Sequence, residues 1–347
     1  MKTRYKFIIG LSVIILLSAA GGGLLYYNIV FKDNVTLPEN QPGYLFVRTG
    51  STYRDLLNTI ESSGYVDDIQ TFRWLAVQKN LSSHVRPGRY EIKDGMSNNQ
   101  LINLLRSGKQ KPLNVTFNSI TFPAQLAGVV SKQIEADSIS IINLFNSSAF
   151  LSKYGLTKET APVMFIPNTY EFYWNTSAEG FFKRMKAEYD KFWTNERKLK
   201  AELIDLTPDE VCIVASIVEK ETNKNDEKAR IAGVYLNRLK RGWKLQADPT
   251  TVYAVYLETG NVLNRVLWAH TQLDHPYNTY VYAGLPPGPI CFPSVTSMDA
   301  VLKSEKHDYM FFVASPDMSG YHRFSTNYNQ HLRYAREYQA ALKQFRK

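Results

Sequence analysis

Two glutamates directly follow an apolar stretch, and either of them could do proton chemistry. Residues 211–218 carry no charge, and Glu219 and Glu221 come immediately after them, separated by a single lysine. Burial and the negative end of a helix dipole both disfavour a carboxylate anion, so a carboxyl group here would have a raised pKa. Such a group keeps a proton near neutral pH, as general-acid cleavage of a glycosidic bond requires. The alternative is that both acids form surface ion pairs with nearby bases, namely Lys220, Lys224 and Arg230.

A strong helix start signal places both glutamates at the end of one helix. Thr207 is a preferred N-cap residue, Pro208 takes the first helical position, and Glu210 completes a capping box. The helix is predicted to run to about Thr222, and its body is apolar on every side, which predicts burial. The two glutamates lie about 200° apart around such a helix, so only one of them can face a given cleft.

Three polar and aromatic segments follow in the C-terminal half, at residues 246–250, 275–294 and 321–331. They are rich in Asn, Gln, Thr and Tyr, which hydrogen-bond to hydroxyl and acetamide groups, while tyrosine rings offer flat apolar faces. One buried acid followed by three such loops predicts a saccharide cleft.

The first thirty residues predict a membrane helix. Basic residues within the first six precede an uncharged run from Phe7 to Phe31, long enough to cross a hydrocarbon core of about 30 Å. This charge distribution predicts a cytoplasmic N-terminus and export of everything after Lys32. The alternative is a cleaved signal peptide, because residues 19–21 are small. The apolar residues that continue beyond the glycines favour an uncleaved anchor.

Composition excludes several classes of protein. The chain has 347 residues, of which 44% are hydrophobic, enough for about two domains with real cores. The formal net charge is +9, but the basic residues are scattered, so nucleic-acid binding is not expected.

Cys212 and Cys291 could pair, although the apolar helix around Cys212 favours two unpaired buried thiols. His270 and His275 lack the spacing of zinc ligands and are expected to be loop hydrogen-bonders, so no metal or cofactor is predicted.

A weak internal repeat follows a polar linker at residues 32–42. Residues 44–57 and 89–105 share one design: a short strand, a glycine turn, a Ser or Thr cap and an amphipathic helix. In the second copy, Ser97 and Gln100 form a predicted capping box. The region resembles a LysM domain, a small module that binds N-acetylglucosamine polymers. A generic α+β spacer is the alternative.

Five motifs in order carry a more specific resemblance, to the YceG-like family of endolytic murein transglycosylases. They are ASIVEKET at 215–222, YLNRL at 235–239, LQADPT at 245–250, YNTY at 277–280 and GLPPGPI at 284–290. The resemblance covers nearly the whole chain and implies cleavage of the MurNAc–GlcNAc bond of nascent peptidoglycan at the inner membrane, leaving 1,6-anhydroMurNAc ends and thereby ending strand elongation.

The implied fold class is α+β, in four parts. These are a cytoplasmic N-terminus and transmembrane helix (1–31), a linker (32–42), a LysM-like domain (43–111) and a mostly helical, lysozyme-like catalytic domain with added strands (112–347). The implied partners are peptidoglycan glycan strands, the inner membrane and peptidoglycan synthases.

The resemblance also implies roles for individual residues. Glu221 is the catalytic acid, without metal or cofactor. The implied substrate-binding residues are Thr222, Gln246, Asp248, Tyr277, Asn278 and Tyr280. Structural residues near the site are Glu219, Asn237, Pro286 and Gly288. Residues 165–174 are expected to form an aromatic-rich loop. The chain departs from the family within it, at Asn168, where an Asp is common, and this departure weakens any catalytic role for that loop.

Two other functions fit the same residues. A muramidase would use a second acid, with Asp248, Glu227 and Asp274 as candidates. A membrane-tethered wall-binding scaffold would have no activity at all, and Glu221 could then be replaced without consequence.

Overall fold

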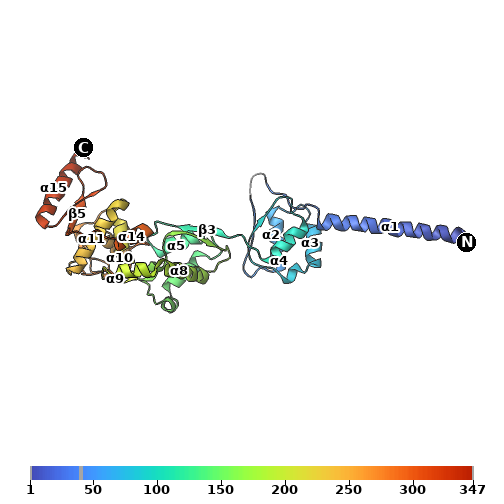
Figure 1. Ribbon diagram of the computed structural model, residues 1–347, viewed down its shortest axis with the longest axis horizontal. Helices are drawn as coiled ribbons and strands as arrows, with labels where there is room; N and C mark the ends of the chain where they lie inside the picture. Colours follow the sequence, from blue (N-terminus) through green and yellow to red (C-terminus); the bar gives the residue numbers. More distant parts are fainter. Residues whose placement is uncertain (1, 39–41, 346–347) are drawn as a thin grey trace. The chain divides into compact units, whose positions relative to one another are not determined.

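The computed structural model describes residues 2–38 and 42–345, which form helices and small two-stranded sheets (Figure 1). The chain divides into two compact units. The first comprises Met1–Asn114 with Glu171–Thr176, and the second comprises Val115–Tyr170 with Ser177–Lys347. The presence of both helices and small sheets confirms the predicted mixture of helix and strand.

The N-terminal helix α1 (Lys2–Val30) is long and apolar enough to cross a membrane. Its candidate span, Tyr5–Val30, has a mean hydropathy of 2.3 and is exposed along most of its length. At its C-terminal end, Val30 joins the core of the first unit and Ile29 packs against that core. An apolar helix that leaves its side chains unburied is suited to a lipid environment.

The internal repeat of the first unit is confirmed. Strand β1 (Gly43–Val47) pairs antiparallel with β2 (Gly88–Ile92), and a capped helix follows each strand. Thr52 forms a capping box with Asp55, and Ser97 forms the predicted one with Gln100. The helices of this unit are α2 (Tyr53–Ser63), α3 (Ile69–Gln78) and α4 (Asn98–Ser107), with a 3₁₀ turn η1 (Leu81–Ser83).

Part of the predicted linker belongs to the folded unit instead. Asp33 and Val35 form isolated β-bridges with Ser97 and Val66. Asn34, between them, is buried and its amide donates 2.7 Å and 2.9 Å hydrogen bonds to Asn98 Oδ1 and the Asp68 carbonyl. The polar composition that suggested a linker here serves internal hydrogen bonds. Residues 39–41 of the predicted linker lie outside the described residues.

The aromatic segment around residues 165–174, expected to be a loop, contains a strand. Strand β4 (Asn168–Phe172) pairs with β3 (Leu113–Phe117). In β4, Tyr170 and Phe172 are buried while Glu171, between them, is exposed, which is the period-two pattern of a half-buried strand. The neighbouring helices are α5 (Pro123–Val130), α6 (Ser138–Asn146), α7 (Ser148–Leu151), α8 (Ala178–Phe192) and α9 (Asn195–Glu202), with 3₁₀ turns η2 (Ser152–Tyr154) and η3 (Ala161–Met164).

Helix α10 (Pro208–Glu221) forms the centre of the second unit, as its sequence predicts. Thr207 caps it with Glu210, and all residues from 211 to 218 are buried. It packs against the helices α9, α11 (Asn225–Lys240), α12 (Asp248–Thr259) and α14 (Val295–Leu302). Each large apolar side chain buried there contributes about 1.5–3 kcal/mol. The remaining elements are α13 (Trp268–Thr271), β5 (Phe311–Ala314), β6 (His322–Ser325) and α15 (Tyr328–Phe345).

The two cysteines are unpaired and buried, as the apolar setting of the first one favours. Cys212 contacts the Met298 sulfur at 3.7 Å, and the Cys291 thiol donates to the Ser216 carbonyl at 3.4 Å. They therefore act as core residues rather than as a covalent link.

Candidate functional site

Glu221 is the last residue of α10, where the buried helix meets a cavity of about 1050 Å³ within the second unit. Its side chain is partly buried. The wall also contains Asp248 and Pro249 from the start of α12 and Ile290 from the segment after the GLPPG turn. A carboxyl group is thus held between an apolar core and a space large enough for a ligand.

Burial raises the pKa of Glu221 to about 7. The Tyr235 hydroxyl donates a 2.5 Å hydrogen bond to Glu221 Oε1 and opposes this rise by stabilising the anion. The negative charge of Asp248 adds to the rise, and Arg238 acts weakly against it. With a pKa near neutrality, one group can both give and take a proton, which is the requirement for acid–base catalysis.

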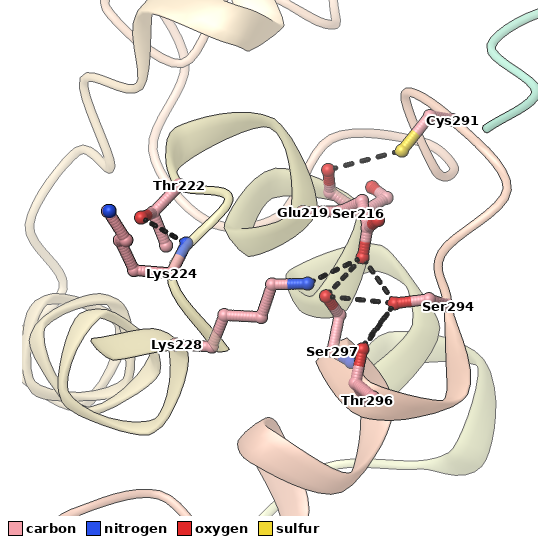
Figure 2. A network of polar contacts seen from close by, with 9 residues as sticks. All are labelled: Ser216, Glu219, Thr222, Lys224, Lys228, Cys291, Ser294, Thr296 and Ser297. Carbon is pink, nitrogen blue, oxygen red and sulfur yellow. Dashed lines mark hydrogen bonds and ion pairs between the residues drawn. The ribbon is translucent and has the colours of Figure 1, made fainter. Parts of the chain in front are cut away.

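Glu219 has the opposite character (Figure 2). Burial by itself would raise its pKa, but hydrogen bonds from Ser294 (2.5 Å) and Ser297 and an ion pair with Lys228 (3.2 Å) outweigh burial and lower it. Lys228 is almost fully buried. The ionised Glu219 ties α10 to α11 and α14, so it fixes the helix end that carries Glu221.

Sequence reasoning missed Tyr235 as the residue that touches the candidate acid. Tyr235 and Arg238 lie one turn apart on α11, in the YLNRL segment, and both are buried. Arg238 donates to the carbonyls of Leu245 and Met310, the latter at 2.8 Å. The sequence did contain a signal for this role of Tyr235. A tyrosine and an arginine lie three residues apart on a helix face that is otherwise apolar.

Asp248 and Tyr280 come together, whereas Gln246 lies apart from the cavity wall. The Tyr280 hydroxyl donates to Asp248 Oδ1 at 2.7 Å. Gln246 is exposed with a φ of 49°, in the left-handed region, and its N–H bonds the Thr279 carbonyl at 3.1 Å. Residues 248–250, expected in a loop, form the first turn of α12.

Three further predicted substrate-binding residues are buried. Thr222 caps the end of α10, and its hydroxyl accepts the Lys224 N–H at 3.0 Å (Figure 2). Asn278 stabilises the loop in which it lies, because its side-chain amide donates a 2.8 Å hydrogen bond to the Leu273 carbonyl. Tyr277 lines a second, largely apolar cavity of about 720 Å³. None of the three is among the residues lining the cavity of Glu221.

Asn237, Gly288 and Pro286, expected to be structural residues near the site, stabilise the packing of neighbouring segments of the second unit. The Asn237 amide donates to the carbonyls of His307 (2.7 Å) and Tyr309 (3.0 Å). A Cβ on Gly288 would lie 2.0 Å from the Glu159 carbonyl oxygen, so only glycine fits there. Pro286 is buried in the same turn.

Only Asp248, of the three candidate second acids, lines the cavity of Glu221. Glu227 is buried and accepts hydrogen bonds from the His322 backbone N–H (2.8 Å) and ring (2.7 Å). Asp274 accepts from the Tyr282 hydroxyl at 2.6 Å. The ring nitrogens of His270 and His275 each accept a local backbone N–H, which confirms their predicted role as loop hydrogen-bonders.

An α+β unit with one carboxyl of near-neutral pKa in a polar and aromatic cavity defines a protein equipped for acid–base catalysis on a sizeable ligand. The sequence model of the YceG-like family matches residues 45–337, and the chain belongs to that family.

Named relatives and a solved structure agree with this assignment. An endolytic murein transglycosylase of Streptococcus pneumoniae R6 is 28% identical over 89% of this chain, and the match spans 61% of that relative's length. One of Bacillus subtilis is 26% identical over 84% of each chain. A crystal structure of a YceG-like protein from Listeria monocytogenes has a TM-score of 0.55 at 24% identity, covering 85% of this chain and 99% of that one, and shows the shared fold.

Proposed function

We propose that the chain is an endolytic lytic transglycosylase that cleaves murein strands between MurNAc and GlcNAc. The observation that carries this proposal is Glu221, a carboxyl group with a pKa of about 7 in the wall of a large cavity. The names of the Streptococcus and Bacillus relatives support murein as the substrate.

One carboxyl group can complete the reaction by itself. Neutral Glu221 donates its proton to the oxygen that links MurNAc to GlcNAc, and the bond between this oxygen and MurNAc C1 breaks. The MurNAc C6 hydroxyl then bonds to C1 and returns its proton to the Glu221 carboxylate. The products are a 1,6-anhydroMurNAc end and a free GlcNAc hydroxyl, so no water is consumed.

Neighbouring residues support both steps. The Tyr235 hydroxyl holds the Glu221 carboxyl in one orientation and stabilises the anion formed after proton donation. Asp248, on the same cavity wall, supplies a negative charge that would favour the positive charge developing at C1. Thr222 and Asn278 act through the backbone they hold rather than through substrate contact.

The proposed location of the reaction rests on the length and apolar character of α1. This helix anchors the chain in the inner membrane, with a cytoplasmic N-terminus, and the two folded units lie on the outer face where strands are made. Cleavage there would end strand elongation and bring the protein close to peptidoglycan synthases. The LysM-like and lysozyme-like descriptions of the two units belong to this proposal.

Asp248 gives a specific reason to test a second function. Since it lies in the same cavity as Glu221, it could act as the second carboxylate of a muramidase that activates water. The two reactions differ in product: hydrolysis adds one water and leaves a reducing MurNAc end, whereas transglycosylation leaves the lighter anhydro end.

Mass spectrometry of sacculi digested by the full chain in detergent decides between these functions. We expect anhydro ends with the wild type and a loss of about 10²- to 10⁴-fold in rate with Glu221→Gln. Glu202→Gln, at an exposed site on α9, is the matched control and should be fully active. Reducing ends would establish a muramidase, and the absence of new ends with both wild type and Glu221→Gln would favour a non-catalytic scaffold.

A further inference from the structure

Three cationic side chains line the cavity that holds Glu221, and they come from three separate segments. Lys220 precedes the acid on α10, Arg265 lies in the loop after α12, and Lys343 belongs to α15. All three are exposed. The ion pairs found within residues 2–38 and 42–345 involve other bases, so these cations remain available to a ligand.

The acids of the same wall offset only part of this charge. Glu221 keeps its proton for much of the time near pH 7, so the negative charge of Asp248, which also acts on Glu221, stands against three cations. The cavity wall therefore carries an excess of positive charge. Because Arg265 and Lys343 are far apart in sequence, only the tertiary structure brings them to one cavity.

A murein strand has one source of negative charge to match these cations. Its N-acetylated sugars are uncharged, whereas the peptides attached to the lactyl groups of MurNAc carry free carboxylates. Arginine binds carboxylates through paired N–H donors, and lysine binds them as a point charge. The Lys220 ammonium already donates to the Thr121 hydroxyl at 2.9 Å, which leaves Arg265 and Lys343 as the freer pair.

We propose that Arg265 and Lys343 bind the peptide carboxylates of the strand, so that the cleft prefers peptide-bearing murein over peptide-free glycan. This inference rests on the proposed function and adds a basis for substrate selection. Neither residue is assigned a part in the bond cleavage itself, which Glu221 carries out.

A binding assay tests the preference without depending on turnover. The protein for this assay is the full chain in detergent, with the substitution Glu221→Gln so that it does not cleave its ligand. It is titrated into fluorescent strand fragments that are either intact or stripped of their peptides by an amidase. We expect tighter binding of intact fragments. Adding R265Q and K343Q should weaken that binding about two- to thirtyfold, the range for two exposed ion pairs, and leave binding of stripped fragments unchanged.

Three controls separate charge recognition from loss of structure. Lys198→Gln, an exposed site on α9 away from this cavity, should have no effect. The pair R265K and K343R should keep most of the preference. Raising the salt concentration should reduce it, because exposed charges are screened.

Several results would overturn the inference. These are equal affinity for intact and stripped fragments, an equal loss on both fragments in the double variant, and no binding of either fragment. Product analysis with the wild-type chain is scored separately, so active cleavage without a peptide preference would refute this inference alone. Absence of cleavage and of binding would refute the proposed function too.

Discussion

The raised pKa of Glu221 has a consequence for stability that requires no substrate. Its pKa is 4.5 ordinarily and about 7 in the folded chain. Below about pH 4.5 the carboxyl is neutral in both folded and unfolded chains, so folding is unaffected. Between about pH 4.5 and 7 the unfolded chain loses this proton while the folded chain keeps it, so stability falls as the pH rises, and the loss is complete above about pH 7. At about 1.4 kcal/mol per pKa unit, the loss is about 3 kcal/mol.

Glu221→Gln removes this loss, because the amide stays neutral and can still accept the Tyr235 hydrogen bond. We expect the melting temperature of the variant to match the wild type near pH 4.5 and to exceed it by about 6–12 °C at pH 8, using about 2–4 °C per kcal/mol. Thermal unfolding of the full chain in detergent, followed by near-ultraviolet circular dichroism across this pH range, measures the difference.

The difference between variant and wild type isolates this one group, since other titrations occur in both proteins. Glu202→Gln, exposed on α9, should give a difference that does not change with pH. A melting-temperature difference for Glu221→Gln that stays constant from pH 4.5 to 8 would refute the argument that burial raises this pKa, and the acid–base proposal would lose its main support.

Three further perturbations have defined outcomes. Tyr235→Phe removes the hydrogen bond that lowers the pKa of Glu221, so the alkaline limb of the pH–rate profile should move to higher pH; an unmoved limb would contradict this role. Gly288→Ala should destabilise the second unit by about 1–3 kcal/mol, seen in denaturant unfolding, because the added methyl meets the Glu159 carbonyl. Glu219→Gln should lower stability at pH 7 and matter less in acid, since its pKa is lowered in the folded chain; the opposite pH trend would reverse its assignment as an anion.

Local chemistry made much of the fold predictable from sequence. The capping boxes at Thr52, Ser97 and Thr207 begin helices where their side chains satisfy free backbone N–H groups, whatever lies elsewhere in the chain. The continuous apolar run of α10 predicted a buried helix ending at two acids. Where several local signals competed, the prediction failed: polar residues 33–35 joined a folded unit, and the aromatic segment 168–172 became a strand.

The sequence by itself determined that a buried helix would end in two glutamates facing different ways, because helix periodicity alone separates them. Which glutamate stays protonated was decided by tertiary structure. Ser294, Ser297 and Lys228, from the N-cap of α14, from α14 itself and from α11, hold Glu219 as an anion. Glu221 accepts a hydrogen bond from Tyr235, and burial together with the charge of Asp248 outweighs that bond and raises its pKa. A pKa depends on the charges and donors around a group, and for these two residues most of those neighbours are brought together only by folding.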